Sequence, residues 1–466
     1  MKSDRMLQTA GFAPKRRRFL TGAAGLSAMG ALAPLGLFAG SAGAAPSDYK
    51  ALVCVFLAGG NDGNNLIVPL DSARYTNYMQ LRSGAGIALS ASGSTYAKLL
   101  AARTATTRMA ATAVAQPFAF HSGLAEIDAL FGAGKVAVAL NTGTLFQPLT
   151  KAQYATGVAV PSQLFSHSDQ IVQMQAGTPA PAGTGWGGRL IDALGSATNL
   201  SSISLGTDAL FADGAAARAS VVPVGTGLAL DGLNLYPPAS AAAKKSALAQ
   251  IIVTDTGNAI ANAANDALGD GIDLAASLQT ASTATFNTVF PSTSIGGQMK
   301  QIAQIIRYSA SQGPRRQIFV ATLGGFDTHS GQAYAQWDLL TQLSAALNAL
   351  YLATMEANLA NQVTAFTQAD FGRTLQPNST GTDHGWGNHH LVVGGAVAGG
   401  LYGNFPDFTL NGPDDVTGRG VWLPQFSTQQ FGATLGAWFG ADATQLAQSV
   451  FSPTLASFTQ RTLGFV

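Results

Sequence analysis

The sequence is poor in cysteine, histidine and charge. It has one cysteine, six histidines and 11% charged residues in a chain of 466. A single cysteine excludes an intramolecular disulfide, and Cys54 lies in the apolar run 51–57, which predicts a buried core thiol instead of a reactive one. No basic stripe is present to match nucleic-acid phosphates or an anionic membrane, so neither is an expected partner. With 47% hydrophobic residues, the chain can still bury one large core or two medium ones.

The first residues predict export. The basic run 15–18 precedes a weakly apolar Ala/Gly/Leu segment that ends in small residues. The pattern resembles a twin-arginine signal peptide over residues 1–44, which implies transport by the twin-arginine translocase in folded form and a periplasmic or secreted location. The alternative is a membrane anchor, but Gly, Ser and Pro34 interrupt the segment, so we expect no stable membrane span after cleavage. Cleavage after Ala44 would leave 19 basic and 23 acidic residues, a net charge of −4.

Apolar runs alternate with helical patterns along the remaining chain. Runs typical of buried strands occupy 52–57, 136–140, 203–205, 317–323, 363–367 and 391–393. Helical periodicity covers 122–131, 297–311 and 333–355. The alternation predicts an α/β domain over residues 45–466 with a mostly parallel central sheet flanked by helices. Residues 207–288 are rich in Ala, Gly, Asn and Ser and contain no histidine, so we expect a helical insertion or cap there.

Polar clusters follow several of the predicted strands. In an open parallel sheet, ligands bind beyond the carboxyl ends of the strands, so these clusters are candidates for a common site. Asp62 follows the first strand, although an Asx turn alone would also explain it. Asp327 and His329 follow another strand, two residues apart, which places both on one side of an extended segment and suits two ligands of one metal ion.

The stretch GTDHGWGNHH, residues 381–390, holds three of the six histidines. Asp383 and His384 are adjacent, and the glycines around them predict a loop tight enough to aim both side chains inward. His389 and His390 then enter the next strand. Because strand side chains alternate, we expect one of the two to point to the site and the other away from it, and we favour His389 for the site.

The segment FSHSDQ, residues 165–170, places two serines near a predicted helix start. Ser166 and Ser168 at such a position could help to bind an anion, although an N-cap role would explain either serine alone. Every histidine, including His167, falls at a glycine or polar junction, which a shared site explains more economically than six separate roles. Carboxylate and imidazole ligands without thiolate favour Zn²⁺ or Mn²⁺, in one or two copies.

These motifs together resemble one protein family. FLAGGNDGNN, FSHSDQ, GWGGRL, LGGFDTHSGQ, DFGRTLQPNSTGTDHGWGNHH and GGAVAGGLYG occur in that order. The sequence is similar to exported bacterial proteins of the DUF1501 type, which look like members of the alkaline phosphatase and sulfatase superfamily. The resemblance spans nearly the whole mature chain and implies an alkaline phosphatase-like fold.

The resemblance also implies roles for single residues. The metal ligands that it implies are Asp62, Asp327, His329, Asp383 and His384. Apart from the resemblance, His167, His389 and His390 are further candidate ligands. Ser166 is the expected nucleophile and Ser168 the second candidate. Arg189 and Arg373 could clamp the oxygens of a tetrahedral anion, or could form structural ion pairs instead.

The leading hypothesis is therefore an exported metal-dependent hydrolase of small phosphate or sulfate esters. The sequence departs from better-known enzymes of the superfamily, because Asp327 and His329 are only two residues apart and no sulfatase-type Cys/Ser-x-Pro-x-Arg motif occurs. The first alternative is a non-catalytic surface or assembly protein whose loops are stiffened by a metal. The second is a metal-free Ser-His-Asp hydrolase, which is less favoured because no G-x-S-x-G motif accompanies the serines.

Overall fold

The computed structural model describes residues 48–466 except 111, 179–182 and 226–236. The predicted signal peptide, residues 1–44, lies outside the described residues. The strands of the main sheet are β1 (Lys50–Ala58), β2 (Ile67–Pro69), β3 (Arg103–Arg108), β4 (Ala115–Phe120), β5 (Val136–Gly143), β6 (Ser202–Leu205), β7 (Ser220–Val222), β8 (Arg316–Gly324), β9 (Val363–Ala369), β12 (Asn388–Gly394), β13 (Gly400–Tyr402) and β14 (Phe426–Ser427).

The twelve strands form one mixed sheet. Its order is β2-β4-β3-β13-β5-β12-β9-β1-β8-β6-β7, with β14 beside β5. From β9 to β7 every pairing is parallel, as are β5 with β13 and β13 with β3. β12 runs antiparallel to both β9 and β5, and β4 runs antiparallel to β2 and β3. The predicted mostly parallel sheet is confirmed. Because β12 is antiparallel to both of its neighbours, β5 and β9 run in the same direction. The carboxyl ends of β5, β9, β1 and β8 therefore meet at one rim of the sheet.

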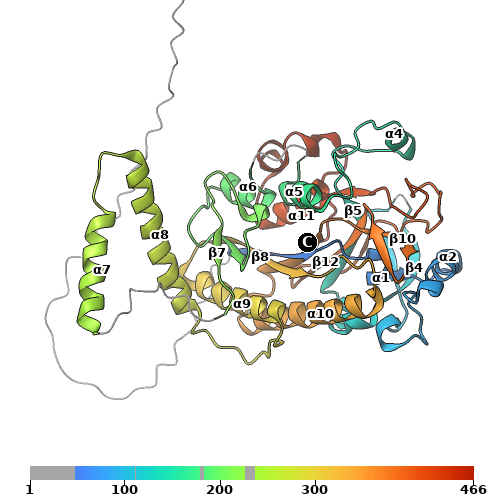
Figure 1. The fold of residues 1–466 in the computed structure, drawn as a ribbon, viewed down its shortest axis with the longest axis horizontal. Coiled ribbons are helices and arrows are strands. Elements are labelled where there is room, and N and C mark those ends of the chain that lie inside the picture. Colours follow the sequence, from blue (N-terminus) through green and yellow to red (C-terminus); the bar gives the residue numbers. More distant parts are fainter. Residues whose placement is uncertain (1–47, 111, 179–182, 226–236) are drawn as a thin grey trace, which may run out of the picture. The chain divides into compact units, whose positions relative to one another are not determined.

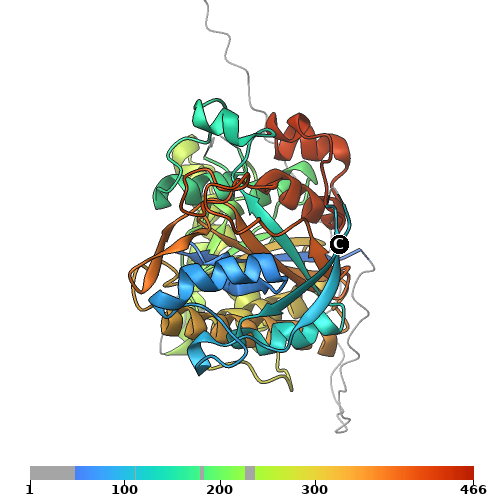
Figure 2. The same cartoon turned by 90° about the vertical axis from the view of Figure 1, so that its right-hand side faces the viewer.

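Helices cover both faces of this sheet (Figures 1 and 2). One face carries α3 (Ala125–Gly132), α9 (Ser294–Gln312) and α10 (Gln332–Glu356), and the other carries α5 (His167–Ala176), α6 (Trp186–Ala193) and α11 (Thr428–Phe439). Side chains of β1 alternate between the two cores, with Val53 and Val55 in the first and Leu52 and Cys54 in the second. Cys54 is fully buried, as expected, and burial raises the pKa of its thiol.

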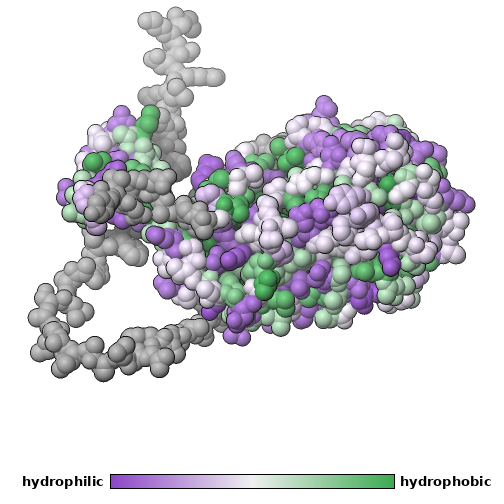
Figure 3. Space-filling view, turned by 60° about the horizontal axis from the view of Figure 1, so that its bottom comes forward, coloured by the Kyte–Doolittle hydropathy of each residue, from purple (hydrophilic) through white to green (hydrophobic). Residues whose placement is uncertain are grey.

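The predicted elements recur with small changes of boundary, and shorter helices fill the connections. These are α1 (Gly63–Leu66), α2 (Ser72–Arg82), α4 (Lys151–Ala155) and α12 (Ala443–Gln445). Within the expected insertion, β7 forms an edge of the main sheet, whereas α7 (Pro238–Ile252) and α8 (Ala259–Ala281) form a helix pair with mostly exposed side chains (Figure 1). In the part of the chain that is described, no helix is both long and apolar enough to cross a membrane. On the face drawn in Figure 3, hydrophobic residues are scattered among hydrophilic ones.

Candidate metal centre

Four side chains from three separate segments meet beyond the carboxyl ends of β8 and β9. His167, Asp327 and His384 each offer one ligand atom, and these atoms lie within 4.8 Å of one another. His329 joins them, because its Nε2 lies 3.0 Å from Asp327 Oδ1 and 3.1 Å from His384 Nε2. Asp327 and His329 follow β8, His167 begins α5, and His384 ends β11 (Gly381–His384). We call these four residues the His/Asp cluster.

Each of these three imidazoles has an oxygen atom within hydrogen-bond distance of its Nδ1. His167 Nδ1 lies 2.7 Å from Asp370 Oδ2, and His384 Nδ1 lies 2.7 Å from the carbonyl oxygen of Phe165. His329 Nδ1 lies 3.2 Å from Asp383 Oδ1. An Nδ1–H that donates to oxygen leaves the lone pair of Nε2 free, and this is how ligating histidines are usually oriented. In the tautomer that donates from Nδ1, the three Nε2 atoms that face Asp327 are acceptors.

The spacing of these atoms fits a divalent cation. Ligand arms of about 2.0–2.1 Å in a tetrahedral zinc site put neighbouring ligand atoms roughly 3.3 Å apart. The corresponding separations here are 3.0, 3.1, 3.2 and 3.5 Å. Two imidazole lone pairs 3.1 Å apart repel each other unless a proton or a cation lies between them. The side chains are 22–44% exposed, so the cluster is open to solvent on one side.

Charges around the cluster keep its groups in the ligating form. Partial burial alone would raise the pKa of Asp327, but the hydrogen bond and positive charge of Arg373, with His329 and His384, lower it to about 2. Burial, with the charges of Arg373 and His167, lowers the pKa of His384 despite its bond to Phe165. Near neutral pH, Asp327 is therefore ionised and His384 is neutral, as metal ligation requires.

The chain turns sharply just before the helix that carries His167. Phe165 adopts a left-handed conformation with φ of 76°, which is a strained backbone for a bulky residue and is found mainly at functional sites. At this turn, the Phe165 carbonyl contacts His384, and the next residue, Ser166, is the N-cap of α5. Ser166 Oγ makes no capping bond; it donates to Asp169 Oδ2 at 2.6 Å and lies 3.2 Å from Ser168 Oγ. The predicted helix start is confirmed, and Ser166 directly precedes the cluster residue His167 in the chain.

The cluster residues lie within the part of the chain that matches a known sequence family. Residues 49–450 match the profile of the family described as Protein of unknown function (DUF1501). The chain belongs to the DUF1501 family. A comparison with curated proteins found no match.

Several solved structures resemble this DUF1501 chain distantly. Ps i-CgsB in complex with k-i-k-neocarrahexaose is 10% identical, and the match covers 85% of this chain and 74% of that one with a TM-score of 0.34. The PsFucS1 sulfatase from Pseudoalteromonas sp. is 9% identical, with coverages of 77% and 65% and a TM-score of 0.32. The zinc complex of the C-terminal periplasmic domain of EcEptC from Escherichia coli is 12% identical, with coverages of 91% and 91% and a TM-score of 0.31. At such low TM-scores, none of their activities or ligands is carried over to this chain.

The stretch 381–390 of this DUF1501 chain is more regular than the predicted loop. β10 (Arg373–Asn378) and β11 form a two-stranded antiparallel sheet in which Arg373 pairs with His384. Gly381 has no left-handed backbone; instead, a Cβ there would collide with the backbone of Thr328 and His329. The glycine is needed for close backbone approach, which brings His384 to His329.

Asp62 does not join the cluster, which corrects the expectation of a metal ligand. Its carboxylate is fully buried and forms a 2.6 Å ion pair with Arg82. Gln332 Nε2 donates to the same carboxylate at 2.6 Å, and the backbone of Asn64 donates to it from α1. Arg82, whose partner could not be inferred from the sequence, neutralises Asp62 and makes it part of the fold.

His389 and His390 also lie outside the cluster, contrary to the expectation that one of them would reach it. They do point to opposite faces of β12, since His389 packs against Phe405 and His390 against Phe431. Both are buried, and His389 Nδ1 accepts a 2.9 Å bond from the backbone nitrogen of Asn141. Burial lowers the pKa of His389 to about 4 and that of His390 to about 3. Each is a neutral core histidine.

The two arginines that were predicted to bind the oxygens of an anion, Arg189 and Arg373, bind protein oxygens instead. Arg189 donates to the carbonyls of Ala176, Thr184 and Val450, and burial lowers its pKa to about 10. Arg373 is buried beneath the cluster, where it donates to Asp327 and to the carbonyls of residues 59, 60, 326 and 382. Most N–H groups of each guanidinium are therefore already used within the protein.

Two residues near the cluster were missed in the sequence. Asp370 comes directly after β9, so the rule that polar residues follow the predicted strands could have found it. Arg419 forms a 2.7 Å ion pair with Asp383, and its side chain is 44% exposed. No motif marks Arg419, because its position depends on how a distant loop folds back over β10.

Asp370 gives a first test of the cluster. The variant Asp370→Asn is expected to weaken divalent-metal affinity about 10–100-fold, because the amide no longer holds His167 as a charged acceptor does. Competition with a chromophoric chelator measures the effect. The matched control Asp266→Asn, at an exposed position of α8, should bind metal as the unaltered protein does. Equal affinities of the two variants would contradict the role given to Asp370.

Proposed function

We propose that this chain is an exported metal-dependent hydrolase of phosphate or sulfate esters. The observation that carries the proposal is the convergence of three imidazole Nε2 atoms on Asp327 in a cluster with one open side. Structural zinc sites are closed, whereas catalytic sites keep a position free for substrate or water. A nitrogen-rich set favours zinc, with manganese as the second choice. Among the described residues, the ligands form a single group, which favours one cation.

The chain's own residues have distinct roles in this proposal. A bound divalent cation would neutralise charge on the transferred group. Ser166 Oγ bonds to the phosphorus or sulfur atom while the bond to the leaving oxygen breaks, and its proton passes to Asp169, the group that already accepts it. Asp169 then returns this proton to the leaving oxygen. Water cleaves the seryl ester in the second half of the reaction and restores the serine.

Substrate binding in this proposal uses exposed positive charge. Arg419 is a partly exposed basic residue at the edge of the cluster, and it is held by Asp383, which in turn contacts His329. The substrate is a small phosphorylated or sulfated molecule. The predicted signal peptide supports a periplasmic or secreted location after passage through the twin-arginine translocase.

The test compares two neighbouring serines. Zinc-loaded protein is expected to hydrolyse an aryl phosphate or an aryl sulfate. The variant Ser166→Ala should lower kcat/KM at least about 100-fold, or about 2.7 kcal/mol in activation free energy, while zinc stays bound. Ser168→Ala is the matched control, because Ser168 is more exposed and is not at the N-cap. Bound zinc without turnover of either ester would favour the non-catalytic, metal-stiffened protein instead.

A further inference from the structure

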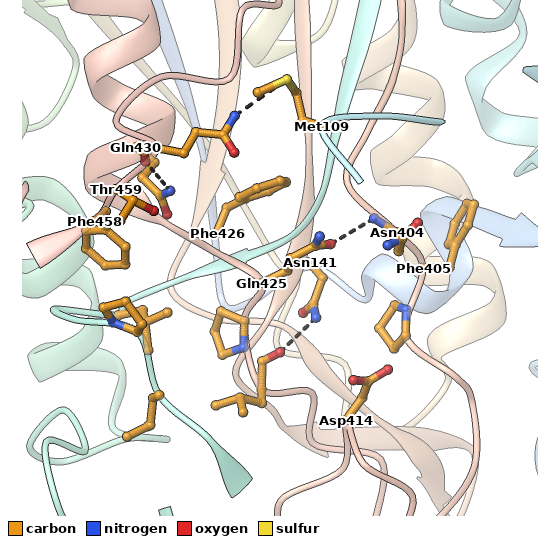
Figure 4. A pocket seen from close by; sticks show the side chains of 17 residues that line it. Met109, Asn141, Asn404, Phe405, Asp414, Gln425, Phe426, Gln430, Phe458 and Thr459 are labelled. Carbon is orange, nitrogen blue, oxygen red and sulfur yellow. Dashed lines mark hydrogen bonds between the residues drawn. The ribbon is translucent and has the colours of Figure 1, made fainter. Parts of the chain in front are cut away.

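A cavity lies on the same rim of the sheet as the His/Asp cluster, apart from the cluster itself. It has a volume of about 560 Å³, and none of its lining residues belongs to the cluster (Figure 4). Asn141 at the end of β5 and Asn404 just after β13 line it, and both strands run in the same direction as β9 and β1. β5 and β9 are two positions apart in the sheet, which puts the cavity roughly 10 Å or more along the rim from the cluster. Ligands of open α/β sheets bind at such rims.

Apart from one carboxylate, the lining of the cavity is uncharged and rich in amides. Side-chain amides come from Asn141, Asn404, Gln425, Gln430 and Gln460, and Thr459 adds a hydroxyl. Asp414 is the one charged residue of the described lining, which includes no Lys, Arg or His. A lone carboxylate without a basic partner repels phosphate and sulfate. The cavity therefore suits a neutral group with many hydroxyls, since amides donate and accept in equal measure.

The walls of the cavity are braced by internal hydrogen bonds. Gln430 Nε2 donates to the Gln460 carbonyl at 2.6 Å, and Asn141 Nδ2 donates to the Leu423 carbonyl at 2.8 Å. The backbone nitrogen of Asn404 donates to Gln425 Oε1 at 2.8 Å (Figure 4). Asn141 also has a left-handed backbone with φ of 46°. Bracing of this kind reduces the entropy that a ligand must remove on binding.

Some polar groups in the cavity have no partner within the protein. In the described structure, the side-chain amide of Asn404 and the hydroxyl of Thr459 make no hydrogen bond, and both residues are at least partly exposed. Phe426 and Phe458 lie beside them as buried rings that shape the wall (Figure 4). Free amides next to apolar walls are typical of sites that orient a polar ligand by a few directed bonds.

We propose that this cavity binds an uncharged polyhydroxylated group, such as a sugar unit of a neutral glycan. The binding needs no metal and does not depend on the proposed hydrolase activity. An apolar cluster separates the two sites, since Leu145 and Phe458 line the cavity and pack with Phe165, whose carbonyl holds His384.

The experiment is direct binding of neutral hexasaccharides. Maltohexaose, cellohexaose and galactohexaose are each added at up to about 10 mM, and binding is followed by saturation-transfer NMR and calorimetry. At least one should bind, and Asn404→Leu should weaken it tenfold or more, because the free amide is lost while the backbone bond stays. Asn287→Leu is the matched control, since that exposed asparagine also uses only its backbone nitrogen.

Several results would overturn the assignment. The first is no binding of any hexasaccharide, and the second is equal binding by the Asn404→Leu variant. The third is loss of binding in Asp327→Asn, which would move the site to the His/Asp cluster. Preferential binding of an alkylammonium ion or of inorganic sulfate would also contradict a neutral ligand. Hexasaccharide binding that persists in Asp327→Asn supports the cavity even if no ester is hydrolysed.

Discussion

Replacement of Arg373 by Met is expected to lower the free energy of unfolding by about 5 kcal/mol or more. Arg373 is buried, and its donors satisfy the carbonyls of residues 59, 60 and 382 at 2.6–2.8 Å. Each buried acceptor left without a donor costs roughly 1–3 kcal/mol, and the Asp327 carboxylate loses its buried counter-charge as well. Without this charge, the pKa of Asp327 is also expected to rise from about 2 toward its usual value.

Arg419→Met is the matched control for this prediction. Arg419 also forms an ion pair with a carboxylate of the site, but its side chain is 44% exposed. Because solvent screens such a pair, Arg419→Met should lower the free energy of unfolding by about 1 kcal/mol or less. Urea denaturation at pH 7.5 measures both variants. Equal losses of stability would show that Arg373 does not hold the rim together.

Acid is expected to unfold the protein through its buried histidines. Burial lowers the pKa of His121 and His389 to about 4 and that of His390 to about 3, against about 6.5 in the unfolded chain. The unfolded state therefore binds more protons below pH 6.5, so stability is fully present above that pH and is lost as the pH falls toward 4. At pH 4.5 the three histidines together lower the free energy of unfolding by on the order of 8 kcal/mol relative to neutral pH. This loss is comparable with the whole stability of a typical domain.

His390 offers the cleanest variant for this test. Both ring nitrogens of His390 lack a partner in the described structure, and the ring packs against Phe431. His390→Leu should therefore keep the fold at pH 7.5. It should also remove about a third of the decrease in the free energy of unfolding between pH 7.5 and 4.5. Urea midpoints measured at several pH values give the slope. A slope that does not change in this variant would mean that His390 is not the neutral core residue described above.

The fold was largely predictable because it depends on local patterns. The apolar runs that became β1, β5, β8 and β9 are short, continuous and bounded by glycine or polar residues, as strands buried on both faces require. The hairpin strands β3 and β4 were not predicted, since alternating polar residues such as those of Arg103–Arg108 also occur in loops. β12 was predicted as a strand, but its antiparallel direction depends on chain connections that periodicity does not contain.

The site was only partly predictable, because a residue type does not reveal its partner. Asp327, His329 and His384 were expected at the rim and lie together there. Asp62 had the same sequence context, yet a buried arginine 20 residues later takes its carboxylate. The choice between ion pair and metal ligand depends on which side chain arrives from another segment, and a single sequence does not specify this.

The most direct test of the central claim is a zinc titration of the purified protein. One tightly bound zinc ion per chain is expected, lost on chelation, with His384→Ala and Asp327→Ala each weakening affinity at least about 100-fold. The control Asp266→Asn, on the exposed surface of α8, should keep the stoichiometry and the affinity. Absence of specific zinc binding, or unchanged affinity in both cluster variants, would contradict the claim that three imidazoles and Asp327 hold a metal ion.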